Sequence, residues 1–305
     1  MRTLALCAAL CASTAASASV LWRGDFETGD LSQWSQIQQG APGRLTIVQS
    51  PVRQGQYAMR VELHQGDVTN SGTRNELALA WTQYQEVEGN DRWYAWSTLF
   101  PPDYPSDDSW QVFTQWHQSA GCCGSPPVEF DVIGETIQMA HDGNPVWTAP
   151  LVRGVWHDFK LHVYWSATAG YVELWYDGQP ALAKTAMQTL AAGAYNYLKQ
   201  GLYRDAAITD VAVLYHDGFV IGTTQADLEP APQDAGIEPP ADGDAGSGDV
   251  APPADPPAVP PAPAAHTSGL PGITGCASVG RGSLALLGLM ALVTWRVRRR
   301  RTRRR

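Results

Sequence analysis

Residues 195–204, Tyr-Asn-Tyr-Leu-Lys-Gln-Gly-Leu-Tyr-Arg, bring aromatic rings and cations together at a spacing that could bind a ligand. Successive side chains of a strand point to opposite faces. One face would therefore hold Tyr195, Tyr197, Lys199, Gly201 and Tyr203, and the other Leu198 and Leu202. The leucine face suits a core, whereas the tyrosine face is too polar for a core, and its bare glycine would let a ligand approach the backbone. We interpret this face as the floor of a groove that binds an anionic polymer built of rings. The alternative is an ordinary strand with one solvated face.

Two earlier stretches repeat the pattern of polar side chains at positions i and i+2. Arg74 and Glu76 would point the same way on one strand. Gln115 and His117 would do so on another, where Phe113 is expected to share their face. Adjacent strands of one sheet would merge these pairs with the tyrosine face into a single polar patch.

The elements that must position these residues are short, aromatic and alternating, with Gly, Asn and Asp between them. The strand candidates are 45–49, 57–63, 94–100, 128–132, 136–140, 157–165, 171–176 and 211–215. Asp177-Gly178 is a tight-turn signal between two of them, and 184–194 is expected to form one short helix. Many short strands with regularly spaced turns favour an all-β fold, an antiparallel sandwich.

An export signal opens the chain. Arg2, the apolar run 4–10 and the small residues that follow predict a secretory signal peptide over 1–18, cleaved after Ala18. The protein is therefore expected in the cell envelope, at the cell surface or outside the cell. Residues 19–227 would form one domain, because the composition changes after them.

Charge is unevenly distributed over the 305 residues. The formal net charge is −9, but eight arginines lie at 296–305 and every acidic residue precedes position 256. Without these eight, Arg2 and Arg281, 11 basic residues stand against 30 acidic ones, a net charge of about −19 for the exported part. A nucleic-acid-binding protein should be basic, so this composition argues against that class. The scarcity of cations also argues against a densely sulfated ligand.

The C-terminal part has the composition of a linker and a tail. Residues 228–272 are rich in Pro, Ala, Asp and Gly and predict a disordered linker. In the tail, 273–305, Cys276 precedes an apolar run that is shorter than the roughly 20 residues spanning a bilayer, and then the arginines. This Gly–Cys pair, apolar run and basic end resemble the sorting tails of myxobacterial envelope proteins. The resemblance implies processing near Cys276 and surface display, with membrane contact through the tail only; a simple membrane anchor is the alternative.

Three motifs resemble those of the alginate-lyase, glucuronan-lyase and heparin-lyase-I type polysaccharide lyases. Arg-x-Glu-Leu, Gln-x-His and Tyr-x-Lys-x-Gly-x-Tyr stand in that order at 74–77, 115–117 and 197–203. The similarity extends over most of 22–222 and implies a β-jelly roll, a concanavalin-like sandwich, whose concave sheet holds the site. Alginate lyases differ in having Ser or Thr in place of Asn75 and Asn in place of Arg204, so the chain looks closer to the glucuronan and heparin-lyase-like branch.

The resemblance implies β-elimination on a uronate polymer, with no cofactor required. The proton on C5 of the uronic acid is removed and the C4 oxygen is expelled, while donors near the carboxylate offset its charge. The expected catalytic residues are Arg74 and Gln115 on the carboxylate, His117 as proton acceptor, and Tyr203 as proton donor to the leaving oxygen. Where the C5 proton and the C4 oxygen lie on one side, as in glucuronate, one Tyr could do both tasks.

A second group of residues is expected to contact the substrate or support the catalytic set. Lys199 would hold a flanking carboxylate and Glu76 would orient Arg74. The remaining members of the substrate-binding set are Tyr195, Tyr197 and Arg204. The expected partner is an anionic polysaccharide: glucuronan-like first, alginate second and heparin-like third.

Two other functions remain open. The first is a non-catalytic carbohydrate-binding module, which would not need Gln115, His117 and Tyr203 together. Gln115 and His117 could then be a hydrogen-bonded pair with a structural role. A sandwich glycoside hydrolase would instead use Glu129 and Glu135 as nucleophile and acid. In this chain, however, the second Glu comes one residue later than in the motif of those hydrolases, and Ile133-Gly134-Glu135 resembles a turn. The remaining histidines are interpreted as structural: His64, His141, His157, His162 and His216.

Cysteines and carboxylates suggest two stabilising features. Cys122 and Cys123 are adjacent in an exported chain with no other core cysteine. A strained vicinal disulfide, two free thiols and pairing between chains remain open, and two cysteines alone do not make a zinc site. Calcium is considered only as a structural ion at Asp25, Glu27 and Asp217; solvated surface carboxylates explain these residues nearly as well.

Overall fold

The computed structural model describes residues 20–119 and 124–229. The expected signal peptide, the cysteines at 122, 123 and 276, nearly all of the linker and the tail lie outside the described residues. Within the described part, no helix is long and apolar enough to cross a membrane.

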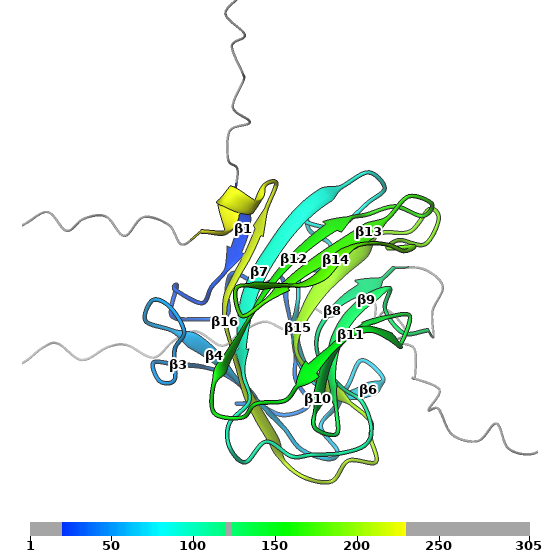
Figure 1. Ribbon diagram of the computed structural model, residues 1–305. Coiled ribbons are helices and arrows are strands. Elements are labelled where there is room, and N and C mark those ends of the chain that lie inside the picture. Colours follow the sequence, from blue (N-terminus) through cyan, green and yellow to red (C-terminus); the bar gives the residue numbers. More distant parts are fainter. Residues whose placement is uncertain (1–19, 120–123, 230–305) are drawn as a thin grey trace, which may run out of the picture.

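Two antiparallel sheets pack against each other as a sandwich (Figure 1). Sheet A contains, in order across the sheet, β14 (Gln179–Ala186), β13 (Tyr171–Tyr176), β12 (Trp156–Tyr164), β7 (Asp91–Leu99), β16 (Ala212–Gly222), β4 (Ala58–Leu63) and β3 (Leu45–Val48); β1 (Val20–Gly24) also pairs with β16. Sheet B contains β11 (Asn144–Pro150), β10 (Thr136–His141), β9 (Val128–Ile133), β8 (Gln111–Gln118), β15 (Asn196–Arg204), β6 (Gly72–Ala78) and β2 (Gln36–Gln38); β5 (Val68–Thr69) also pairs with β6. A 3₁₀ turn, η1 (Gln225–Leu228), follows β16.

The core lies between the sheets and consists of the inward side chains of both. Along β12, buried and partly exposed side chains alternate at every position, as a half-buried strand requires. Trp96 and Phe159 of sheet A stack with their ring centroids 5.0 Å apart, and Phe130 of sheet B meets both edge-on. The expected all-β sandwich is therefore confirmed.

One expected element is wrong. Residues 184–194 form no helix, because 184–186 continue β14, which pairs with β13. The expected turn at Asp177-Gly178 joins these strands, with φ angles of 49° and 74°. Once this turn has started the hairpin, cross-strand pairing outweighs the local helix propensity of the alanine-rich sequence.

A bulge in β8 changes which side chains face the core. The register between β8 and β9 shifts between Val112 and Thr114, so β8 carries one extra residue. Phe113 is consequently turned into the core, with 1% of its surface exposed. The expectation that it shares a face with Gln115 and His117 is wrong, because the extra residue reverses the alternation along the strand.

Candidate active site

The three predicted motifs lie on the adjacent strands β6, β15 and β8 of sheet B. Leu198 and Leu202 of β15 pack in the core, so the opposite face carries the tyrosines and Lys199. The pairs across the strands are Tyr203 with Arg74, Lys199 with Gln115, and Tyr197 with His117. The predicted merging of the polar pairs into one patch is therefore confirmed.

A groove of about 320 Å³ lies over these strands. All four expected catalytic residues line it: Arg74, Gln115, His117 and Tyr203. Residues that the motifs do not include also line it, among them Trp110, Val112, Glu129, Asp131 and Gln138. The groove is thus a place where one substrate could meet the whole expected set.

Glu76 holds the polar residues of the groove in position. Its Oε2 accepts hydrogen bonds from Arg74 Nη1 at 3.1 Å and from Lys199 Nζ, and its Oε1 accepts one from Gln115 Nε2 at 2.6 Å. Burial alone would raise the pKa of Glu76, but the cations of Lys199 and Arg74 outweigh it and keep the pKa below its usual value. Glu76 is therefore ionised, and its expected role of orienting Arg74 extends to Gln115.

His117 has the protonation state of a base. Burial first, and then the charge of Lys199, lower its pKa to about 4, so the ring is neutral at neutral pH. Its Nδ1 lies 2.8 Å from the carbonyl oxygen of Gln118. Because that oxygen can only accept a hydrogen bond, Nδ1 carries the proton and Nε2 keeps a free lone pair.

Tyr203 is fixed by its neighbours on both sides. The guanidinium carbon of Arg74 lies 3.7 Å from the ring centroid of Tyr203, and Trp110 contacts the ring edge-on at 4.7 Å. These contacts hold the ring in one orientation and leave it half-buried at the groove.

Lys199 and Gly201 have different roles from those expected. Lys199 is 1% exposed and its ammonium pairs with Glu76, so it supports the site from within instead of holding a flanking carboxylate of the substrate. A Cβ on Gly201 would lie 2.6 Å from the Cα of Glu76. The glycine therefore allows the close approach of β6, not of a ligand.

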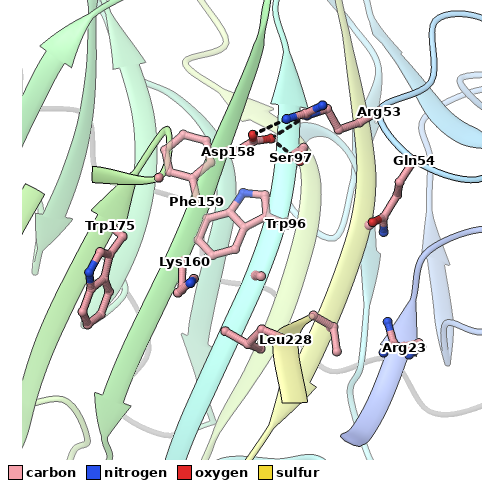
Figure 2. Close-up of a pocket in the computed structure, with 14 residues that line it drawn as sticks. Arg23, Arg53, Gln54, Trp96, Ser97, Asp158, Phe159, Lys160, Trp175 and Leu228 are labelled. Carbon is pink, nitrogen blue, oxygen red and sulfur yellow. Dashed lines mark hydrogen bonds and ion pairs between the residues drawn. The ribbon is translucent and has the colours of Figure 1, made fainter. Parts of the chain in front are cut away.

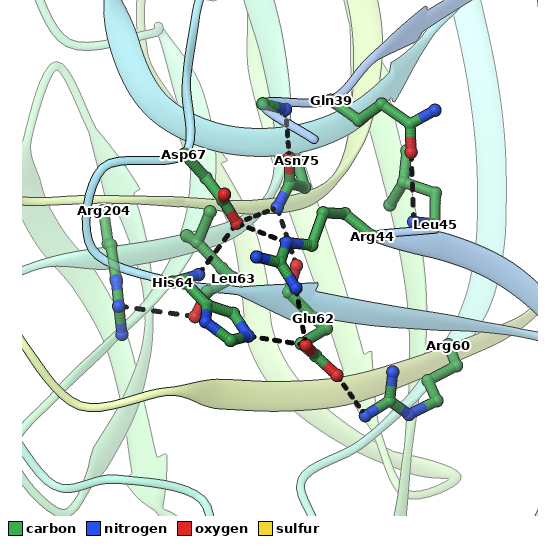
Figure 3. A network of polar contacts seen from close by, with 11 residues as sticks. Gln39, Arg44, Leu45, Arg60, Glu62, Leu63, His64, Asp67, Asn75 and Arg204 are labelled. Atoms are coloured by element: carbon green, nitrogen blue, oxygen red, sulfur yellow. Dashed lines mark hydrogen bonds and ion pairs between the residues drawn. The ribbon is translucent and has the colours of Figure 1, made fainter. Parts of the chain in front are cut away.

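Arg204 does not reach the groove, which corrects the expected substrate contact. It follows Tyr203 and so points to the opposite face of β15, with 1% of its surface exposed. Figure 3 shows its Nη2 directed at the carbonyl oxygen of Leu63, 3.4 Å away. In the same network, Asn75 donates to Asp67 at 3.1 Å and accepts from the Gly40 amide at 2.7 Å. The two positions that depart from alginate lyases are thus structural here.

The other two tyrosines lie beside the groove. Tyr197 and His117 have their ring centroids 5.4 Å apart, and burial first, then Glu76, raise the pKa of Tyr197 to about 12, so it keeps its proton. Tyr195 precedes β15, where its backbone pairs with Ser119, and it does not line the groove.

Calcium at Asp25, Glu27 and Asp217 stays a prediction of the sequence. The described ranges contain no group of three or more His, Cys, Asp or Glu side chains that could hold a metal. Asp25 accepts a hydrogen bond from Gln33 Nε2, while Glu27 and Asp217 accept from backbone amides. These hydrogen bonds hold neighbouring loops in place.

The glycoside-hydrolase pair Glu129 and Glu135 is also separated. Glu129 lines the groove, but Glu135 follows Gly134 in the turn between β9 and β10 and makes an exposed two-bond ion pair with Arg153, at 2.6 and 3.0 Å. The two carboxylates therefore do not face one substrate. Alternation along β9 and its register with β8 could have placed Glu129 and Asp131 in the groove, but the bulge in β8 is not visible in the sequence.

A second hollow, of about 380 Å³, lies on the outer face of sheet A. Figure 2 shows Lys160 and Trp175 on one side and Arg23 on the other, with Arg53 bound to Asp158 through two hydrogen bonds of 2.9 and 2.7 Å. None of the expected catalytic residues lines this hollow, so the candidate active site is the groove on sheet B.

Comparison with known proteins identifies the family. No curated protein sequence matches the chain. Endo-β-1,4-glucuronan lyase from the fungus Trichoderma reesei is similar in structure, with a TM-score of 0.58, 18% identity, and coverage of 69% of this chain and 98% of that one. The catalytic domain of a GH131 β-glucanase from Podospora anserina is similar with a TM-score of 0.50 and 14% identity, and the match covers 67% of this chain and 95% of that one. The catalytic domain of a glycoside hydrolase family 131 protein from Coprinopsis cinerea is similar with a TM-score of 0.50 and 16% identity, and the match covers 70% of this chain and 95% of that one. At these identities the likenesses show the fold alone. A model of the family described as polysaccharide lyase matches residues 26–220, more than half of the chain, which therefore belongs to the polysaccharide lyase family.

Proposed function

We propose that this polysaccharide lyase cleaves a uronate polymer by β-elimination in the groove on sheet B. The observation that carries the proposal is the meeting of Arg74, Gln115, His117 and Tyr203 on one groove, two of them fixed by Glu76. A binding module would need no buried ion pair to aim these groups.

The first step is removal of the proton on C5. Arg74 and Gln115 bind the uronate carboxylate, so that the negative charge that develops on it is offset when the C5–H bond breaks. Neutral His117 can take the proton at Nε2 if the sugar presents it on that side. For a glucuronate-type sugar, Tyr203 as tyrosinate takes the proton instead.

The second step is expulsion of the C4 oxygen. The electron pair from the C5–H bond forms the C4–C5 double bond, the C4–O4 bond breaks, and Tyr203 donates a proton to the leaving oxygen. The fixed orientation of the Tyr203 ring supports this role, because proton transfer requires the donor at hydrogen-bond distance from the oxygen. A glucuronate polymer is proposed first and alginate second, with heparin-like glycans third because cations are scarce.

The test is the ultraviolet absorbance of the full chain mixed separately with glucuronan, alginate and heparin. The elimination product has a C4–C5 double bond conjugated to the carboxylate and absorbs, whereas hydrolysis yields a saturated product. A rise with a uronate polymer supports the proposal. New reducing ends without absorbance would replace it by hydrolysis, and binding without either signal would replace it by a binding module. Export and surface display stay predictions of the sequence.

A further inference from the structure

We infer that the hollow on the outer face of sheet A is a second, non-catalytic binding site for the uronate polymer. The ligand is the polymer class of the proposed function, so the inference rests on that function. The hollow, of about 380 Å³, is lined by strands of sheet A, whereas the catalytic groove lies over strands of sheet B. Because the two sheets pack against each other, the two sites lie on opposite faces of the sandwich, and one sugar cannot occupy both.

One row of paired residues across sheet A builds the hollow. Arg23 pairs with Val220, and Val220 pairs with Ala95. Ala95 pairs in turn with Lys160, and Lys160 with Trp175. The residues on either side of this row along β7, β12 and β13 pack against the core, so the row points outward. Three strand intervals of about 4.8 Å place Arg23 and Lys160 roughly 14 Å apart, with two small apolar side chains as the floor between them.

Two cations of the hollow make no ion pair with the residues that the structure describes. None of the ion pairs in this part of the chain includes Lys160 or Arg23, and Arg23 donates to the backbone carbonyl of Glu229 at 3.4 Å. Asp158 is the single acid among the described lining residues, and Arg53 offsets its charge through two hydrogen bonds. The hollow is therefore positively charged on a chain that is acidic overall, which suits an anionic ligand.

Trp175 gives the hollow an aromatic wall that is supported from behind. Its ring centroid lies 5.4 Å from that of Trp93, and Trp93 stacks on His162 at 4.1 Å. The two ring nitrogens of His162 lie 2.6 Å from a carboxylate oxygen of Glu173 and 2.7 Å from one of Asp91. These contacts hold the aromatic rings in place, while Trp175 stays partly exposed. A ring that is already oriented loses little conformational entropy when a ligand binds.

The cations and the indole together fit a sugar acid. One face of a pyranose ring carries C–H groups and can pack on an aromatic ring, and a carboxylate makes charge-assisted hydrogen bonds with ammonium and guanidinium groups. Figure 2 shows Lys160 beside Trp175 on one side of the hollow and Arg23 on the other. A polymer lying across the strands would place a ring on Trp175, the carboxylate of that sugar at Lys160, and a later carboxylate towards Arg23. An uncharged glucan would leave both cations unused, and a small anion would leave the indole uncovered.

The first test counts binding sites on the full chain carrying Tyr203→Phe, which slows cleavage. Tetrasaccharides cut from glucuronan and from alginate are too short to span both faces of the sandwich, so equilibrium dialysis counts each site separately. We expect two bound molecules per chain for at least one of these ligands, and one after Lys160→Met or Trp175→Ala. Lys184→Met is the matched control, because it removes an exposed cation of sheet A outside the hollow and should leave two. A count of two in neither case, or one that the hollow variants do not change, would overturn the inference.

The second test assigns the chemistry of recognition. Arg74→Met is added to Tyr203→Phe to weaken the groove, so that the remaining binding reports on the hollow. We expect a tetrasaccharide of glucose, which has the rings but no carboxylates, to bind about tenfold more weakly or less than the uronate tetrasaccharide, and added salt to narrow the difference. Equal affinity at low salt would refute the role of Lys160 and Arg23.

Both tests are independent of the lyase reaction. In the otherwise unmodified chain, Lys160→Met and Trp175→Ala should leave kcat/KM for the tetrasaccharide unchanged, because neither residue lines the groove. A fall in kcat/KM that matches the loss of binding would show one shared site and overturn the inference. Absence of absorbance with every uronate polymer would overturn the proposed function, whereas the count of bound tetrasaccharides would still decide whether the hollow binds uronates. Lys160→Met keeps the apolar stem of the side chain, so it serves as the test if Trp175→Ala fails to fold.

Discussion

Glu76 and Lys199 form an ion pair in which each side chain is 2% exposed, and the same carboxylate binds Arg74 and Gln115 of the groove. Burial lowers the pKa of Lys199 to about 8 although Glu76 opposes the shift, so the lysine still carries its charge at neutral pH. Glu76 and Lys199 therefore contact the groove residues Arg74 and Gln115 from beneath, and in the proposed mechanism they would act on the substrate through these two side chains.

The first prediction concerns this ion pair. Glu76→Gln leaves two buried cations without their counter-charge, so we expect a loss of about 3–5 kcal/mol in the free energy of unfolding, together with loss of lyase activity. Chemical denaturation measures the first effect and product absorbance the second. The double variant Glu76→Leu with Lys199→Met leaves only Arg74 without its counter-charge, so it should regain part of the stability without regaining activity. If activity returned as well, Glu76 would have no positioning role.

The second prediction tests Tyr203. Tyr203→Phe removes the hydroxyl that donates the proton but keeps the ring against Arg74, so we expect kcat to fall about 10²–10⁴-fold with unchanged thermal stability. Tyr164→Phe is the matched control, because Tyr164 stacks on Tyr171 in sheet A, away from the groove. Retained activity in Tyr203→Phe would rule out the proposed proton transfer.

The third prediction is the pH dependence that His117 imposes. Its pKa is lowered to about 4, and the neutral form is the one that accepts a proton, so activity that depends on it should persist as pH falls through 6 and decline near pH 4. The logarithm of kcat/KM against pH measures the titration in the free enzyme. The variant His117→Asn has no imidazole ring, so the decline of kcat/KM near pH 4 should be absent from its pH profile. A decline centred near pH 6.5 would show that the ring is not shielded as the structure indicates.

Alternation was sufficient to predict much of the site. The leucine face of β15, the polar pairs on β6 and β8, and the sandwich itself follow from a period of two residues. The confirmed polysaccharide lyase family followed from the motifs, since their order and types are visible in the sequence. The sequence was therefore sufficient to predict which positions of a regular strand face the core and which face outward.

Two kinds of feature could not be predicted. The position of Phe113 depends on a bulge in β8, which is a property of paired strands and leaves no periodic signal. Whether a polar residue faces substrate or another protein group depends on neighbours far along the chain. Lys199 meets Glu76, 123 residues earlier, and Arg204 meets Leu63, 141 residues earlier.

The fourth prediction follows from the corrected position of Arg204. Its guanidinium is buried, away from the groove, so we expect Arg204→Met to keep the apolar packing of the side chain and to leave KM for the polymer unchanged. Arg74→Met, which removes a groove cation, should raise KM and lower kcat. A rise in KM for Arg204→Met that matches the rise for Arg74→Met would restore Arg204 to the substrate-binding set.

The last prediction concerns Asp217, whose carboxylate Oδ2 accepts hydrogen bonds from the backbone amides of Arg53 at 2.6 Å and Gln54 at 3.1 Å. Burial outweighs these bonds and raises the pKa of Asp217 to about 7. The folded state therefore binds a proton more tightly than the unfolded state, so the contribution of this group to stability is full below pH 4 and is lost as pH rises towards 7. About 1.4 kcal/mol per pKa unit gives a loss of up to about 4 kcal/mol by pH 8.

Asp217→Asn can still accept the amide hydrogen bonds and cannot ionise. We expect the variant to become more stable relative to the unmodified chain between pH 4 and pH 8, as measured by chemical denaturation at both values. Asp158→Asn is the control of opposite sign, because Arg53 and Ser97 outweigh burial and lower the pKa of Asp158. The loss in free energy of unfolding that Asp158→Asn causes should become larger as pH rises. If CaCl₂ stabilised the unmodified chain but not Asp217→Asn, the carboxylate would be a metal ligand, because a bound cation would compensate the buried charge that the variant removes.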